Sequence, residues 1–243
     1  MADIDEIAPD VYRIALYNKA TDFQFASFLV KDEEPLLYHT NLRRAFPEVR
    51  DAVATLVDPA TIRWVGFSHF EPDECGAMNE WLAIAQRAEP LCSFVGARVC
   101  MADFCDRPAR VLAKDERLDT GHHRFRVLQT AHVPHGWDAS LLFEETGRTL
   151  FVSDLFGQGG RNEPLTESDI VGRAGDYTRR QATGPMAHAM PYTPRTAPIL
   201  EELAVLEPQT LAAMHGSSFH GDGAAAIRDL SAMLAETIGR EAA

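Results

Sequence analysis

The stretch His69-Phe70-Glu71-Pro72-Asp73-Glu74 directly follows an apolar, strand-like run at residues 62–67. It places one imidazole and three carboxylates side by side along the chain. Carboxylates this close repel one another, so they are stable when a multivalent cation neutralises them or when water covers them fully. Because further histidines and an aspartate follow downstream, the pattern favours a metal site over a solvated acidic surface.

The local pattern places these side chains on one face. His69, Glu71 and Asp73 alternate, so an extended segment would direct all three to the same side. Pro72 disfavours helix at Glu71. We expect a helix to begin near Asp73, with its N-terminus toward the metals. Its buried stripe would carry Ala77, Trp81, Ile84 and Ala85.

Three later segments carry further candidate ligands. His132 and His135 follow an alternating run, Asp154 follows the apolar residues 149–152, and His215 follows residues 210–214. A strand can hold a side chain rigidly at its end while the following loop opens the site. We therefore expect these segments to share one metal centre, with His135 as the ligand and His132 as a second-shell donor or an alternative ligand.

The order His-x-Glu-x-Asp, then His, Asp and His resembles the diiron branch of the metallo-β-lactamase superfamily. It is similar to the flavodiiron proteins, and more similar to short oxygen-binding diiron proteins that carry Glu where flavodiiron proteins carry His and that lack a flavodoxin domain. The zinc hydrolases of the superfamily instead have His-x-His-x-Asp-His. Glu71 and Glu74 stand at the second and last histidines of that motif.

The resemblance implies two iron ions joined by an oxo or hydroxo bridge. It assigns His69, Glu71 and His135 to one iron, Asp73, Glu74 and His215 to the other, and Asp154 to both as a bridge. Glu74 could bind, bridge, or turn away and leave an open position; an acid at a helix N-terminus is the structural alternative. His188 and Tyr192, in one loop, are further second-shell candidates.

The donor types support this metal independently. Three imidazoles and four carboxylates suit iron or manganese, whereas closed structural zinc sites favour thiolates and imidazoles. Zinc or manganese remains the alternative. No glycine loop that would cradle a phosphate opens a helix, so we expect no FMN.

Alternating strand and helix patterns predict a mixed α and β chain, and the resemblance implies an αβ/βα sandwich of two mixed β-sheets flanked by helices. No linker or repeat divides the candidate ligands, so we expect one domain over residues 1–243. The expected strands are 11–16, 23–30, 35–38, 210–214 and segments near Ile62, Leu91, Phe125, Leu141 and Phe151. The expected helices start at Pro47 and Asp73, span 198–206, and carry Ile227, Leu230, Leu234 and Ile238.

Composition excludes several classes of protein. A net charge of −13, from 23 basic and 36 acidic residues, argues against a nucleic-acid surface. The acidic N-terminus and the lack of a long apolar run predict a cytoplasmic protein without a membrane segment. The four cysteines have no Cys-x-x-Cys spacing, so we expect reduced thiols. The resemblance adds a homodimer.

The sequence therefore predicts a non-haem diiron protein that binds O2 or another small diatomic molecule, with oxygen sensing as one role and a redox or signalling protein as partner. Two alternatives stay open. One is an O2 or NO reductase, an oxidoreductase that depends on a partner for electrons. The other is a dinuclear metallohydrolase, in which a hydroxide between two metals attacks an ester.

Overall fold

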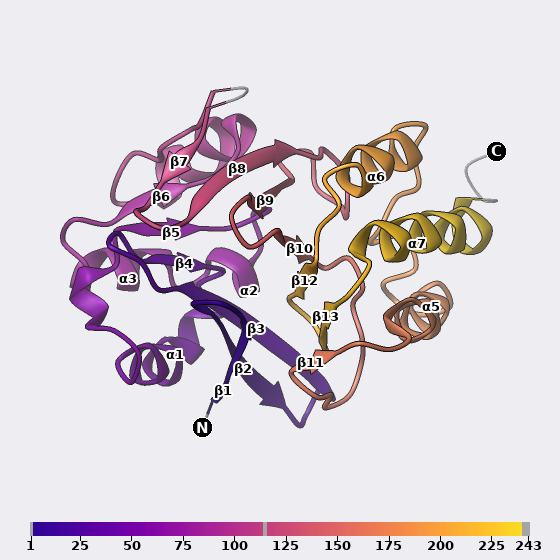
Figure 1. The fold of residues 1–243 in the computed structure, drawn as a ribbon, viewed down its shortest axis with the longest axis horizontal. Helices are drawn as coiled ribbons and strands as arrows, with labels where there is room; N and C mark the ends of the chain where they lie inside the picture. The colour runs from indigo at the N-terminus through magenta and orange to yellow at the C-terminus, as the bar shows by residue number, and fades with distance from the viewer. Residues whose placement is uncertain (1, 114–115, 240–243) are drawn as a thin grey trace.

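The computed structural model describes residues 2–113 and 116–239, and two mixed β-sheets lie face to face at its centre (Figure 1). Helices α1 and α3 cover the outer side of one sheet, and α5, α6 and α7 cover the outer side of the other. This order of layers confirms the expected αβ/βα sandwich. That residues 1–243 form a single domain stays a prediction.

The first sheet holds its strands in chain order. It consists of β1 (Asp3–Ala8), β2 (Val11–Asn18), β3 (Phe23–Val30), β4 (Leu36–Tyr38), β5 (Trp64–Gly66) and β6 (Glu89–Leu91). Strands β1 to β4 are antiparallel neighbours, whereas β4, β5 and β6 run parallel. Parallel neighbours need crossover connections. These are supplied by η1 (Arg43–Ala45), α1 (Phe46–Val53), η2 (Pro59–Thr61), α2 (Pro72–Cys75) and α3 (Met78–Ile84).

The second sheet has the order β11, β13, β12, β10, β9, β8, β7. Its strands are β7 (Leu118–Asp119), β8 (Arg124–Gln129), β9 (Ser140–Glu144), β10 (Thr149–Ser153), β11 (Leu165–Thr166), β12 (Thr210–Ala213) and β13 (Ser218–His220). Its helices are α5 (Ile170–Gln181), α6 (Thr196–Ala204) and α7 (Gly223–Thr237); a π-helix, η3 (Gly96–Met101), and α4 (Ala102–Phe104) precede β7. Strands β10 and β12 are parallel, so their carboxyl ends meet at one edge.

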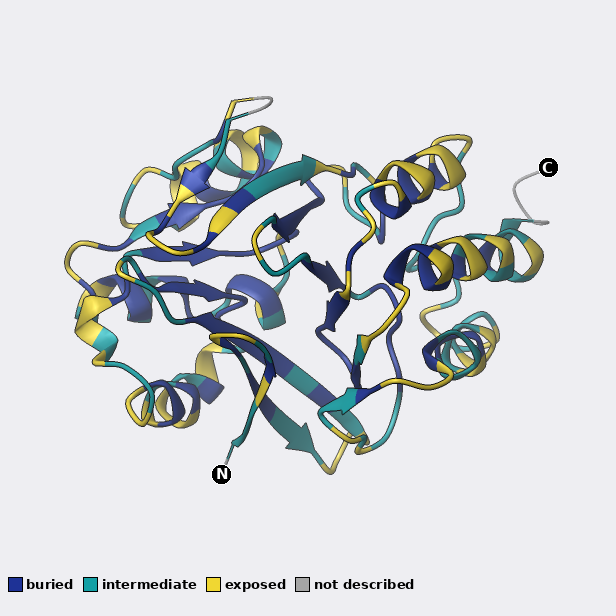
Figure 2. Ribbon diagram, in the orientation of Figure 1, coloured by how far each residue is buried: buried dark blue, intermediate teal, exposed yellow. Residues whose placement is uncertain are grey.

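Three apolar cores hold the layers together. The central core lies between the sheets, where Phe28 of β3 meets Phe151 of β10 with ring centroids 5.4 Å apart. Trp81 of α3 belongs to the outer core of the first sheet, and Leu230 of α7 to that of the second. Helices α5, α6 and α7 each show one buried and one exposed side (Figure 2), as expected for helices that cover a sheet.

The predicted helix after Asp73 is divided in two. Helix α2 ends at Cys75 and α3 begins at Met78. Between them, the backbone N–H of Ala77 donates to the carbonyl of Asn41 at 3.2 Å and to the hydroxyl of Thr40 at 3.1 Å. These tertiary bonds replace the intrahelical bond that a continuous helix would need. Of the predicted buried positions, Ala77, Trp81 and Ala85 are fully buried, whereas Ile84 is only partly buried.

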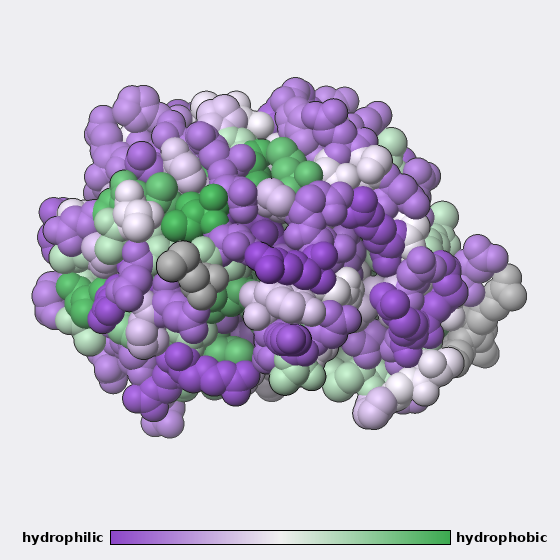
Figure 3. Space-filling view, turned by 90° about the horizontal axis from the view of Figure 1, so that it is seen from below, coloured by the Kyte–Doolittle hydropathy of each residue, from purple (hydrophilic) through white to green (hydrophobic). Residues whose placement is uncertain are grey.

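One face of the molecule is largely polar. The face shown in Figure 3 is mostly hydrophilic, with separate hydrophobic areas between the hydrophilic ones. Among the described residues, no helix is both long and apolar enough to span a bilayer.

Candidate metal centre

The candidate ligands lie at the ends of strands from both sheets. His69 follows β5 of the first sheet, and Asp154 and His215 follow the parallel strands β10 and β12 of the second. His135 lies in the connection from β8 to β9. Glu71 is the extended residue directly before α2, with φ −135° and ψ 154°, as Pro72 predicts. These segments are distant along the chain, and the fold brings their ends together.

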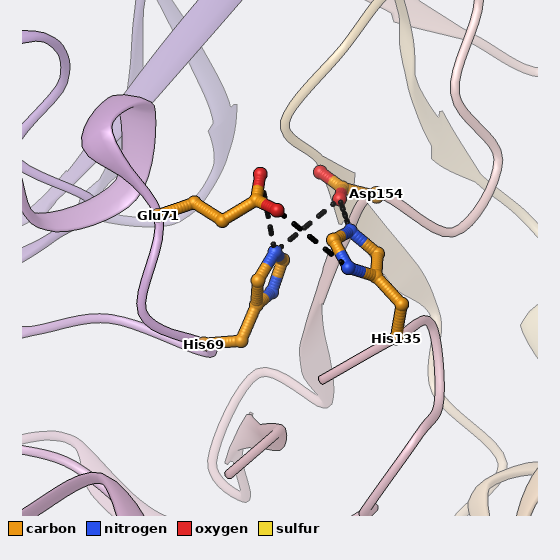
Figure 4. Close-up of side chains that lie close together, drawn as sticks. All are labelled: His69, Glu71, His135 and Asp154. Carbon is orange, nitrogen blue, oxygen red and sulfur yellow. Dashed lines mark hydrogen bonds and ion pairs between the residues drawn. The ribbon is translucent and has the colours of Figure 1, made fainter. Parts of the chain in front are cut away.

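Four of these residues form one compact group. Ligand atoms of His69, Glu71, His135 and Asp154 all lie within 4.8 Å of one another (Figure 4). The carboxylate oxygens of Glu71 lie 3.7 Å from Nε2 of His69 and 3.7 Å from Nδ1 of His135. Two imidazoles and two carboxylates therefore face a common point.

Asp154 connects this group to a second one. Its Oδ2 lies 2.8 Å from Nε2 of His135 and 3.5 Å from Nε2 of His69. Its Oδ1 lies 3.1 Å from Nε2 of His215, which is also 3.5 Å from Oδ2 of Asp73. The two oxygens of one carboxylate thus face different sets of donors, which is the geometry that a bridging ligand requires.

Contacts across the two sheets orient His215. Its Nδ1 donates to the carbonyl of Gln24 on β3 at 2.8 Å, so Nε2 is left to face the acids. The guanidinium of Arg13 on β2 donates to the carbonyl of Gly216 at 2.6 Å. Gly216 has φ +100°, and a Cβ there would come within 2.5 Å of the side chain of Gln158. Only glycine fits this turn without displacing its neighbours.

Glu74 is the one proposed ligand that the structure does not bring to the others. Its Oε1 lies 3.3 Å from Nδ1 of His69, whereas Nε2 of that ring faces Asp154. The carboxylate is fully buried and accepts hydrogen bonds from the backbone N–H groups of Ser68 and His69 and from the hydroxyls of Ser68 and Ser153. Its place is behind His69, which corresponds to the alternative in which it turns away.

His39 lies beside Glu74 in the same buried region. Its Nε2 is 3.6 Å from Oε1 of Glu74, and within the described part of the chain neither ring nitrogen has a hydrogen-bond partner. Burial lowers the pKa of His39, although the charges of Glu74 and Asp154 oppose this shift.

The charged side chains of this site shift one another's pKa values strongly. Burial alone would lower the pKa of His69, but Glu74, Glu71 and Asp154 raise it to about 10. Burial raises the pKa of Asp73 to about 6, with Asp154 adding to the shift and His215 opposing it. Burial would also raise the pKa of Asp154, yet His135, His215 and His69 hold it well below its usual range. Such dense coupling is typical of functional sites.

One direct observation supports a metal ion at these residues. Nε2 of His69 is buried and, among the described atoms, has no hydrogen-bond partner, although it points at two carboxylates. A buried polar atom without a partner costs free energy, and a cation at that point would satisfy it. Imidazole nitrogens mixed with carboxylate oxygens suit iron, manganese or zinc better than a soft thiolate metal.

The compact group of four does not include His132, His188 or Tyr192. His132 and His188 are exposed, and the backbone N–H of His132 donates to the carbonyl of Gly136. Tyr192 packs against the core of the second sheet beside Gly239. The structure instead places Ser68 and Ser153 around His69. Small polar residues at the ends of β5 and β10 are the only sequence signal for them.

Asp138 is a further residue that sequence analysis missed. It is buried, and its carboxylate accepts a hydrogen bond at 2.9 Å from the backbone N–H of Phe70. This bond ties the turn that carries His69 and Glu71 to the loop that carries His135.

A cavity of about 430 Å³ opens onto the metal ligands. Glu71, Asp73, His135, Asp154 and His215 line one end of it. Its walls come from α5, α7 and the residues 182–190 between α5 and α6, and they include Tyr177, Met190 and Leu234. No lysine or arginine is among the described residues that line it.

Comparison with known proteins identifies the family. The model of a family described as "ODP family beta lactamase" matches residues 23–216, which include every candidate ligand. The chain belongs to this family. The expected resemblance to the flavodiiron branch of the metallo-β-lactamase superfamily is confirmed.

Individual relatives agree with this membership. The chain is 24% identical to the rubredoxin-oxygen oxidoreductase of Megalodesulfovibrio gigas over 201 residues, which are 81% of this chain and 49% of that protein. It is 24% identical to diflavin flavoprotein A 1 of Synechocystis over 155 residues, or 63% of this chain and 27% of that protein. The chain thus spans half or less of the length of these relatives.

Solved structures show the same fold. The rubredoxin oxygen:oxidoreductase of Desulfovibrio gigas matches with a TM-score of 0.80 and 20% identity, over 95% of this chain and 61% of that chain. A flavodiiron protein from Giardia intestinalis matches with a TM-score of 0.81 and 16% identity, over 96% of this chain and 59% of that chain. These matches confirm the architecture of the ODP-family chain.

Proposed function

We propose that this chain is a non-haem diiron protein that binds O2. The observation that carries the proposal is the position of Asp154, whose two carboxylate oxygens face His135 and His215 separately. His69, Glu71 and His135 would hold one metal, Asp73 and His215 the other, and Asp154 both. Bound iron would supply reversible one-electron chemistry and a place for a diatomic molecule.

The protein's own residues prepare this site. The carbonyl of Gln24 fixes the ring of His215, and Glu74 fixes the ring of His69, so each Nε2 is directed inward. Because Glu74 lies behind His69, the second metal would receive only Asp73, His215 and Asp154 from the described residues. Fewer protein ligands leave room for an exogenous molecule.

The lining of the cavity favours binding of a small uncharged ligand rather than a phosphate ester. Enzymes that act on phosphates place arginine or lysine beside them, and neither residue lines the described cavity. An apolar approach suits O2 or NO. The metallohydrolase is therefore the weaker alternative, and hydrolysis of generic phosphate esters by the metal-loaded protein would test it.

A partner-dependent O2 or NO reductase is the second candidate, and the names of the relatives favour it. Electrons would then come from a separate redox protein. Sustained O2 consumption on addition of rubredoxin and a reductase, with NADH, would favour this enzyme, whereas a single round of O2 uptake would favour binding or sensing. A signalling partner, a homodimer and a cytoplasmic location belong to the same proposal.

Purification without air tests the metal and its chemistry together. We expect elemental analysis to find two iron atoms per chain and the optical spectrum to change when O2 is added. A preparation that holds one tightly bound zinc and shows no spectral change with O2 would contradict the proposal.

A further inference from the structure

The cavity above the metal ligands is much larger than a diatomic molecule requires. Its volume of about 430 Å³ is what about fourteen waters occupy in the liquid. We propose that this cavity binds a neutral, mainly apolar organic molecule of about ten to fourteen non-hydrogen atoms, in contact with the metal site.

The walls have the composition of a ligand pocket. Leu155 and Phe156 line it from the segment after β10, and Leu230 and Leu234 line it from α7. All four are buried core residues, so this side of the pocket is rigid. Water molecules make few favourable interactions with such apolar walls. Binding of an apolar molecule that displaces this water would therefore be favourable.

The opposite wall is adaptable and carries a few polar groups. Met186 and Met190 come from residues 182–190, and their flexible thioether side chains fit ligands of varied shape. Tyr177 and Gln181 lie on α5, where the amide of Gln181 donates to the Tyr177 hydroxyl at 2.5 Å. A small number of polar groups among apolar ones is what orients a bound molecule.

An aromatic contact joins this wall to the metal ligands. The ring of Phe23 stacks on Tyr177 with centroids 5.5 Å apart and lies 4.4 Å from the ring of His215. A molecule in the cavity would therefore touch the same surface that holds His215 in place.

Charge indicates that the occupant is neutral, and this step rests on the proposed function. The three carboxylates at the end of the cavity, together with Glu74 behind His69, balance two divalent cations. No lysine or arginine among the described lining residues would attract an acid. A charged ligand would have no partner for its charge, so its burial would be unfavourable.

The test uses 1-naphthylamine, a neutral dye within this size range whose fluorescence responds to apolar surroundings, added without air to the protein with its metals in place. We expect saturable binding of one dye per chain. Thr178→Trp fills the cavity from the rigid helix α5 and should weaken binding about tenfold or more. Val205→Trp is the matched control, because Val205 is β-branched, 64% exposed at the end of α6, and outside the cavity lining.

Metal content and circular dichroism verify that each variant folds. If Thr178→Trp does not fold, Ala187→Trp fills the cavity from another wall. The absence of saturable binding to the unmodified protein would overturn the proposal. So would a dye affinity in both filled variants that equals that of the unmodified protein. The dye is measured without O2, so its failure leaves the diiron proposal intact, and a failed iron analysis leaves the dye result intact.

Discussion

Oε1 of Glu74 lies 3.3 Å from Nδ1 of His69, while Nε2 of the same ring lies 3.5 Å from Asp154. A carboxylate behind an imidazole fixes the proton on Nδ1 and makes Nε2 the more basic donor. Burial alone would raise the pKa of Glu74, but His69 and His39 lower it, so the carboxylate is ionised. Glu74 thus acts through His69 as a positioning residue.

Glu74→Gln should weaken metal binding about 10–100-fold, because the amide NH2 group cannot accept the hydrogen bonds that one of the two carboxylate oxygens now accepts. Ser68 and His69 both direct backbone N–H groups at Oε2. Titration with a chelator of known affinity measures the change. Glu207→Gln, at an exposed glutamate paired with Arg148, is the control. Equal metal affinity in the two variants would show that Glu74 has no role in orienting His69.

Asp154→Asn tests the bridge. Loss of the negative charge between His135 and His215 should reduce metal content to one ion per chain or fewer, since the remaining donors form two separate groups. Elemental analysis gives the number. His132→Asn, at an exposed histidine three residues from His135, should retain the full content. A variant at Asp154 that still held two metals would rule out bridging.

Gly216→Ala should destabilise the protein by about 1–3 kcal/mol and displace His215. The reason is both a positive φ and a Cβ that would contact Gln158. Gly160→Ala separates these causes, because Gly160 also has a positive φ, of +84°, but a Cβ there would meet nothing within 4 Å. Urea denaturation compares the two. If both lose the same stability, contact with Gln158 is not what requires glycine at 216.

A buried pair far from the metals predicts a pH dependence. Nδ1 of His123 lies 3.2 Å from Oε1 of Glu144. The interaction with the Glu144 carboxylate raises the pKa of His123, and the pKa of Glu144 is lowered although burial opposes this. The raised pKa of His123 contributes stability that is fully present below about pH 6.5 and is lost as the pH rises. The lowered pKa of Glu144 contributes stability that is present above about pH 4.5 and is lost as the pH falls.

His123→Gln should therefore cost about 1 kcal/mol near pH 5.5 and less near pH 9. Urea midpoints at the two pH values measure this difference. His188→Gln, at an exposed histidine, should change neither. A loss that is the same at both pH values would show that the ion pair does not contribute.

The positions of His69, Asp154 and His215 could be predicted because each follows a short apolar strand. That pattern can be read from the local sequence. Because the strands before Asp154 and His215 are parallel neighbours, both residues lie at the same edge of the second sheet. The side-chain direction of Glu74 could not be predicted, because it depends on hydrogen bonds from Ser68 and from Ser153, which belongs to the other sheet.

Helix α5 and the cavity it forms were missed for a different reason. The helix contains Gly172 and Gly175, which weaken helix propensity, and only Ile170, Ala174 and Gly175 are buried along it. Its helical state depends on packing against α7, which is distant in sequence. A cavity wall built from such tertiary contacts leaves little periodic signal.

Because His69, Glu71 and Asp73 come from one sheet and His135, Asp154 and His215 from the other, metal ions at this centre would join the two halves of the chain. Binding free energy is then linked to unfolding: each tenfold rise in free metal above its dissociation constant adds about 1.4 kcal/mol to stability. In a cell, the supply of the metal that this centre binds would therefore help to set how much of this protein stays folded and escapes degradation.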